Sequence, residues 1–152
     1  MTPKEMLYCT AEDLYEACKN SAIEGWARDL STESADIVAG RIQAAIMRAT
    51  DEMNLYLVKT GNLPLPVVPR SLRDICVKLS LYSLMSRKGL TEGSSDNTVK
   101  TNRDTALKQL EMIAAGKLDL GLSVDNTPMP SVENKVVTAF PPNRMDPRNR
   151  IW

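Results

Sequence analysis

The side chains that could perform chemistry in this sequence are three cysteines and several neighbouring carboxylates, and histidine is absent. Histidine is the commonest general base and metal ligand and the usual partner of a catalytic serine or cysteine, so its absence weighs against those sites. Cys76 falls on the apolar face of an expected helix and is interpreted as a core residue. Cys9, Cys18 and Cys76 include no C-x-x-C pair, which favours free thiols in a reducing compartment.

The carboxylates Glu12–Asp13 and Asp51–Glu52 are adjacent pairs on expected helices. A general acid and base must face each other in a site that separates their pKa values, and neighbouring helical positions do not face each other. Solvated charge is therefore the simpler interpretation, also for Glu111. Ser94–Asp96 and Gly121–Asp125 lack the spacing of a phosphate loop and the full ligand set of a calcium loop. We expect no catalytic residues, no cofactor, no metal site and no enzymatic activity.

Size and charge narrow the class of protein. The chain has 152 residues, of which 43% are hydrophobic, so one domain with a real core is expected. Lysine plus arginine and aspartate plus glutamate both number 19, and this neutral balance weighs against general polyanion binding. The N-terminal residues do not resemble a secretory signal, and no long apolar run is present, so a cytosolic protein with no membrane span is expected.

Hydrophobic periodicity predicts four helices that share one core. They are expected over residues 10–18, 34–61, 69–88 and 97–115. The helix from Ser34 to Gly61 is the strongest signal, at about 26 residues, and it ends at a glycine suited to left-handed backbone. Thr10 is expected to cap the first helix, and Pro69 to begin the third. Four methionines are interpreted as core filler, with an adaptable contact stripe as the alternative: Met47, Met53, Met85 and Met112.

Three connections depart from the helical pattern. Gly25–Ser31 is expected to be a loop, and Lys117–Leu122 a short strand or extended segment. Gly61–Pro69, the proline-rich strut, contains three prolines and is expected to be a semi-rigid, polyproline-like spacer that fixes the angle between its two helices. Its aliphatic side chains are expected to be buried: Leu63, Leu65, Val67 and Val68.

Residues 123–152, the C-terminal arm, contain five prolines that exclude a long helix, together with apolar residues uncommon in a solvated linker. Within the arm, Lys135–Phe140 is the only strand-like run. Basic side chains outnumber acidic ones after Asn134, which favours docking on an acidic partner surface, with Trp and Arg as typical anchors. A frayed terminus is the alternative. The candidate docking residues are Val136, Val137, Phe140, Arg144, Met145, Arg148, Arg150, Ile151 and Trp152.

Several stretches, taken in order, resemble one known family. They are Tyr8–Leu14, Asn54–Leu57, Gly61–Pro66 with Pro69 and Leu72, Arg103–Leu110, Ile113–Lys117 and Leu120–Leu122. The ordered set resembles the Mu-like phage and prophage family of head-tail joining proteins, also described as head completion or connector proteins. The basic, aromatic-ended arm is similar in kind to the extended end of that family.

The resemblance implies a small helical subunit that assembles with itself as a ring, commonly of twelve, beneath the portal protein of a tailed phage head. Such a ring extends the DNA channel without binding DNA specifically and offers a surface to a tail-side terminator or neck protein. The extended end would insert into the portal. The expected location is the virion, at the head-tail interface, after assembly in the bacterial cytoplasm.

The sequence therefore predicts an all-α fold: a small helical bundle with one long helix, a proline-rich strut and an extended C-terminal arm. Residues 1–122 are expected to form the connector domain and residues 123–152 the docking arm. The leading hypothesis is a non-catalytic head-tail connector. The alternative is a soluble helical adaptor that binds a single protein partner through its tail. The absence of a basic recognition helix weighs against a DNA-binding module.

Overall fold

The computed structural model describes residues 6–61, 63–89 and 94–121, and all of their regular structure is helical. The elements are α1 (Ala11–Ala17), α2 (Asn20–Ala27), α3 (Ala35–Leu57), the short 3-10 helix η1 (Val58–Thr60), α4 (Arg70–Arg87) and α5 (Ser94–Ala114). The predicted all-α bundle is thus confirmed. Among these helices none is long and apolar enough to cross a membrane. The C-terminal arm lies outside the described residues.

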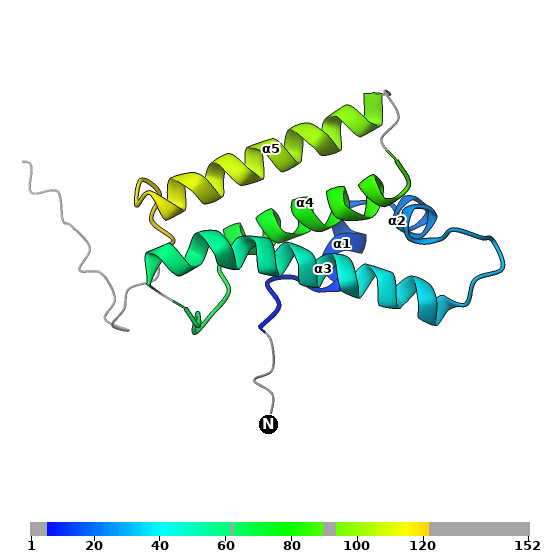
Figure 1. The fold of residues 1–152 in the computed structure, drawn as a ribbon, viewed down its shortest axis with the longest axis horizontal. Coiled ribbons are helices and arrows are strands. Elements are labelled where there is room, and N and C mark those ends of the chain that lie inside the picture. The colour runs from blue at the N-terminus through cyan, green and yellow to red at the C-terminus, as the bar shows by residue number, and fades with distance from the viewer. Residues whose placement is uncertain (1–5, 62, 90–93, 122–152) are drawn as a thin grey trace, which may run out of the picture. The chain divides into compact units, whose positions relative to one another are not determined.

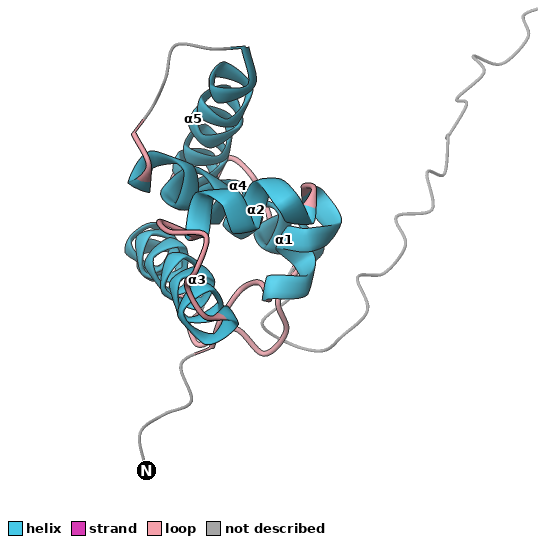
Figure 2. Cartoon of the chain, turned by 90° about the vertical axis from the view of Figure 1, so that its right-hand side faces the viewer, coloured by secondary structure: helices cyan, strands magenta, loops and turns pink. Residues whose placement is uncertain are grey.

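Helix α4 is the centre of the bundle. It packs against α1, α2, α3 and α5, and in Figure 1 it runs between α3 and α5. Figure 2 shows the two short helices α1 and α2 grouped beside it. Its position follows from its sequence, because buried residues occur on more than one side of this helix. They are Leu72, Ile75, Cys76, Val77, Leu79, Ser80, Leu84 and Met85.

Helix α3 confirms the long helix predicted from periodicity. Its buried residues recur at three- and four-residue steps, which places them on the side that faces the core. They are Val38, Ile42, Ala45, Ile46, Ala49, Thr50, Met53 and Leu57. The last turn tightens into η1, and the helix ends at Gly61, whose φ of 71° is the left-handed conformation that glycine adopts without strain.

Helix α2 was not predicted, and the starts of α4 and α5 differ from the prediction. Gly25–Ser31 was expected to be a loop, but residues 25–27 form the end of α2. Ile23 and Ala27 lie one turn apart and are fully buried, so packing of this turn outweighs the unfavourable glycine within it. Helix α5 begins three residues before the predicted Asn97, and Pro69 lies just before α4 as its cap instead of in its first turn. Residues 117–121 form no strand: residues 117 and 118 lie in a bend, and Gly121 has a left-handed φ of 67°.

The proline-rich strut is only partly as predicted. Leu65 is buried at 3% exposure, and Leu63 and Val68 pack against the core. Val67 is 66% exposed, which corrects the expectation that all four aliphatic residues are buried. The chain bends at Pro66 and Val67, and this bend turns Val67 away from the core. The Leu63–Pro64 peptide bond is cis.

Candidate functional site

The docking residues predicted in the C-terminal arm all lie outside the described residues, as does the strand-like run 135–140. Their role stays a prediction. Within the described part of the chain, the feature best suited to binding is an open apolar hollow of about 480 Å³. Sequence reasoning did not single it out, because its walls come from three separate segments.

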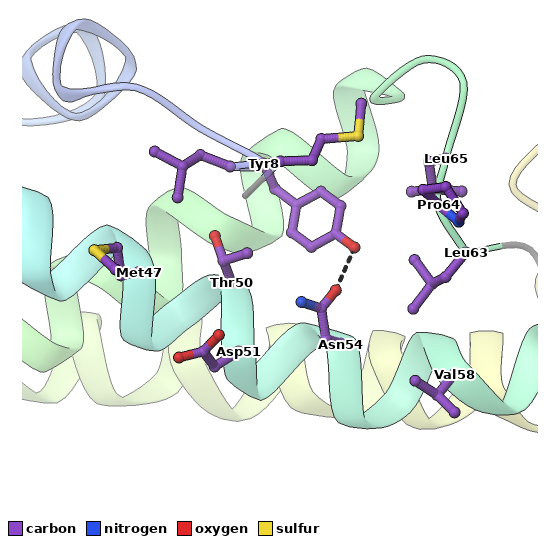
Figure 3. Close-up of a pocket in the computed structure, with 11 residues that line it drawn as sticks. Tyr8, Met47, Thr50, Asp51, Asn54, Val58, Leu63, Pro64 and Leu65 are labelled. Carbon is purple, nitrogen blue, oxygen red and sulfur yellow. Dashed lines mark hydrogen bonds between the residues drawn. The ribbon is translucent and has the colours of Figure 1, made fainter. Parts of the chain in front are cut away.

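This hollow, the apolar groove, lies between the segment before α1, the outer side of α3 and the beginning of the strut (Figure 3). Met47, Asp51, Asn54 and Val58 follow one another at three- and four-residue steps, so α3 and η1 present them on a common face. The groove is lined by Met6, Leu7, Tyr8, Met47, Thr50, Asp51, Asn54, Val58, Leu63, Pro64 and Leu65.

One hydrogen bond holds the wall of the groove in place. The Tyr8 hydroxyl donates to Oδ1 of Asn54 at 2.5 Å, and Figure 3 shows the two side chains pointing toward each other. Tyr8 itself is 3% exposed, and this burial raises the pKa of its hydroxyl, which therefore stays a donor. The bond joins the segment before α1 to a helix 46 residues further along the chain.

Apolar side chains are exposed around this groove. Met6 and Met47 are each 40% exposed, and Val58 is 64% exposed. A cluster of exposed apolar side chains beside a hollow is typical of an interaction site, and methionine adapts its shape to a partner. The prediction that the four methionines are core filler is therefore correct for Met53 and Met85, which are buried. It is wrong for Met47 and Met112, which are exposed.

Two of the carboxylates considered for chemistry, Asp13 and Glu52, have structural contacts. Asp13 completes a capping box with Thr10 at the start of α1, and its other oxygen lies 3.9 Å from Arg73. Glu52 lies 3.6 Å from Arg103, which also stacks over the ring of Tyr82. In the described ranges, no group of three or more acidic or cysteine side chains is arranged to hold a metal ion. Asp13 and Glu52 therefore help to hold helices together.

A network of charged side chains, which sequence reasoning missed, ties α2, α3 and α4 together. Arg41 makes a two-pronged contact with Glu33, at 2.6 and 2.9 Å, and lies 3.0 Å from Asp29. Arg87 also pairs with Asp29, and both arginines donate to the Ala27 carbonyl. The hydrogen bonds from Arg41 lower the pKa of Glu33 to about 2. Asp29 and Glu33 lie in the loop between α2 and α3. Their ion pairs with Arg41 and Arg87 therefore fix this loop against α3 and α4.

The fold and the groove define a small helical protein with an open apolar groove on its described surface. A family model described as "Bacteriophage Mu, Gp36" matches residues 8–139, and the chain belongs to this family. The resemblance to Mu-like phage proteins is thus confirmed, and the chain is a phage protein of the structural or assembly kind. A comparison with curated proteins gave no match.

Proposed function

We propose that this protein is a head-tail connector, which forms a ring below the portal, extends the DNA channel and joins the head to the tail. The observation that carries the proposal is the family match, which covers residues 8–139 and so includes the helical bundle and the first part of the C-terminal arm. The rigid bundle and its exposed apolar groove support a role in assembly. Ring formation, commonly with twelve copies, is part of the proposal.

Contact between neighbouring copies is assigned to the apolar groove and the exposed side of α3. Met47, Leu55 and Val58 are exposed there, and burying them between subunits would remove apolar surface from water. The formal net charge of the chain is zero, so identical copies have no overall charge repulsion to overcome. A ring interface on this face is heterologous, with the groove of one copy meeting a different surface of the next.

The C-terminal arm supplies the contact with the portal in this proposal. Its apolar and basic residues would dock together, with Phe140 and Trp152 as anchors and arginines beside them. Ordering an extended segment costs about 1–2 kcal/mol per residue in backbone entropy, so a partner surface must supply the stabilisation. A tail-side terminator or neck protein would bind the opposite end of the ring.

DNA would pass through the ring without specific binding. A strongly basic inner wall would hold the duplex through counterion release, whereas a neutral subunit lets it slide. A map of the assembled ring with a continuous belt of lysine and arginine on its inner wall would contradict this part of the proposal.

The proposal is tested by light scattering of the purified protein, alone and mixed with its cognate portal ring. The full chain is compared with a version that ends at Leu122. Recruitment of many full-length copies to the portal, lost in the shortened chain, is the expected result. Equal recruitment of both versions would move the portal contact to the helices. No recruitment of the full chain would instead support the adaptor that binds a single protein partner.

A further inference from the structure

Two cysteines far apart in the sequence meet inside the bundle. The sulfur of Cys9 lies 2.9 Å from the sulfur of Cys76, and the two residues are separated by 67 positions. Cys9 belongs to the segment before α1 and Cys76 to α4, and both side chains are buried, at 2% and 0% exposure. Both are free thiols in the structure, as is the half-buried Cys18.

We infer that Cys9 and Cys76 are an oxidisable pair, which a small peroxide such as hydrogen peroxide converts into a disulfide within the chain. A disulfide bond is about 2.05 Å long, so the two sulfur atoms, now 2.9 Å apart, need to move closer by only about 0.9 Å. The proposed connector role makes no use of either thiol, and the inference does not depend on that role.

The surroundings give the two thiols different parts in the reaction. The Cys9 thiol donates to the sulfur of Cys76, and this hydrogen bond lowers the pKa of Cys76 while it raises that of Cys9. The thiolate is the reactive form, so Cys76 is the sulfur that peroxide oxidises first when local opening of the segment before α1 admits the peroxide. The Ser80 hydroxyl lies 3.8 Å from the Cys9 sulfur and donates to the Cys76 carbonyl at 2.8 Å, which fixes this turn of α4 beside the pair.

The reaction balances with one molecule of hydrogen peroxide. The Cys76 thiolate attacks one peroxide oxygen, the O–O bond breaks, and the released hydroxide takes a proton to become water, which leaves a sulfenic acid on Cys76. The Cys9 sulfur then attacks the sulfenic sulfur, the S–O bond breaks, and the departing hydroxide takes the Cys9 proton as a second water. The two thiols have then lost two electrons, and peroxide has gained them.

The disulfide would fix a wall of the apolar groove. Cys9 directly follows Tyr8, which lines the groove and bonds to Asn54. In the reduced protein this segment is held by side-chain packing and hydrogen bonds, and it can open locally. A covalent bond to α4 would prevent that opening, so oxidation would make the groove more rigid.

The test uses the full-length protein in hydrogen peroxide, followed by denaturation, alkylation of the remaining thiols and mass spectrometry. We expect one alkylated cysteine per chain, Cys18, and a linked peptide that contains Cys9 and Cys76, both reversed by a thiol reductant. The Cys18→Ala variant should form the same link, and Cys9→Ser should form none within the chain. Three alkylated cysteines, or a link that includes Cys18, would overturn the inference.

A second measurement tests the effect on the groove wall. Limited proteolysis of the oxidised and reduced full-length chain should show slower cleavage around Cys9 after oxidation, with no difference for Cys9→Ser under the same treatment. Equal cleavage rates for the two forms of the natural sequence would refute the claim that the bond fixes this wall.

Discussion

The hydroxyl of Tyr8 donates a hydrogen bond to the side-chain oxygen of Asn54 at 2.5 Å, and so connects the segment before α1 to the C-terminal half of α3. Tyr8 is buried whereas Asn54 is half-buried, so the bond lies at the boundary between the core and the apolar groove. The same segment continues directly into Cys9 and the capping box of α1. This short stretch therefore links the groove to the core.

Tyr8→Phe removes only the hydroxyl and should destabilise the protein by about 0.5–1.5 kcal/mol, the usual contribution of one hydrogen bond. Half-buried Asn54 can partly replace the lost bond with water. Urea denaturation measures the change, and Tyr15→Phe is the matched control, because Tyr15 is a half-buried tyrosine on α1 whose hydroxyl has no hydrogen bond within the described residues. An equal loss in both variants would show that the bond to Asn54 contributes nothing specific.

Glu33→Gln should lower the free energy of unfolding at neutral pH and make the stability of the protein less sensitive to acid. Arg41 holds the pKa of Glu33 at about 2 in the folded protein, below the ordinary value of 4.5. A carboxylate with a lowered pKa stabilises the folded state above its ordinary pKa, and this stabilisation is lost as the pH falls toward the folded value. The difference between the two proteins should therefore shrink between about pH 4.5 and pH 2.

Denaturation midpoints at a series of pH values measure this effect. Asp36→Asn is the control, since Asp36 is an exposed acidic residue in the first turn of α3. A constant difference between the natural sequence and Glu33→Gln across that pH range would contradict the assigned role of Arg41.

Ile46 and Met47 are neighbours on α3 with opposite environments, at 0% and 40% exposure. Ile46→Ala should destabilise the bundle by about 2–5 kcal/mol, because it leaves a cavity in the core. Met47→Asp should cost about 1 kcal/mol or less, because the site is on the surface and the main penalties are the lower helix propensity of aspartate and its repulsion with Asp51 one turn on. Under the proposed function it should nevertheless weaken recruitment into the ring, measured by light scattering with the portal. Normal assembly of the Met47→Asp variant would show that the groove is not part of the subunit interface.

Thr10→Ala should destabilise the protein by about 1 kcal/mol, since the Thr10 hydroxyl accepts from the Asp13 amide and Asp13 accepts from the Thr10 amide in return. Ser34→Ala is the matched control, because Ser34 precedes α3 in the equivalent position and makes no capping hydrogen bond through its side chain. Thermal unfolding distinguishes the two variants. A larger loss in Ser34→Ala than in Thr10→Ala would contradict the observed caps.

Local patterns were sufficient for much of the fold. The repeated apolar residues of α3, the glycine that ends it and the Thr10 cap are properties of short segments, and each was predicted correctly. Helix α2 as a whole was missed because Gly25 and Trp26 are weak helix formers, and burial of Ile23 and Ala27 against other helices outweighs that preference. Val67 was misplaced for a related reason, since a bend and not its hydrophobicity decides its exposure.

The sequence by itself determined the helical class, the long α3, the neutral charge and the resemblance to Mu-like phage proteins. Only the tertiary structure decided which distant residues meet: Tyr8 with Asn54, Cys9 with Cys76, and Arg41 and Arg87 with Asp29. The physical reason is that periodicity records which side of a helix is buried, whereas the partner across the core depends on how the connections turn the chain. The apolar groove and the cysteine pair both depend on how the connections turn the chain.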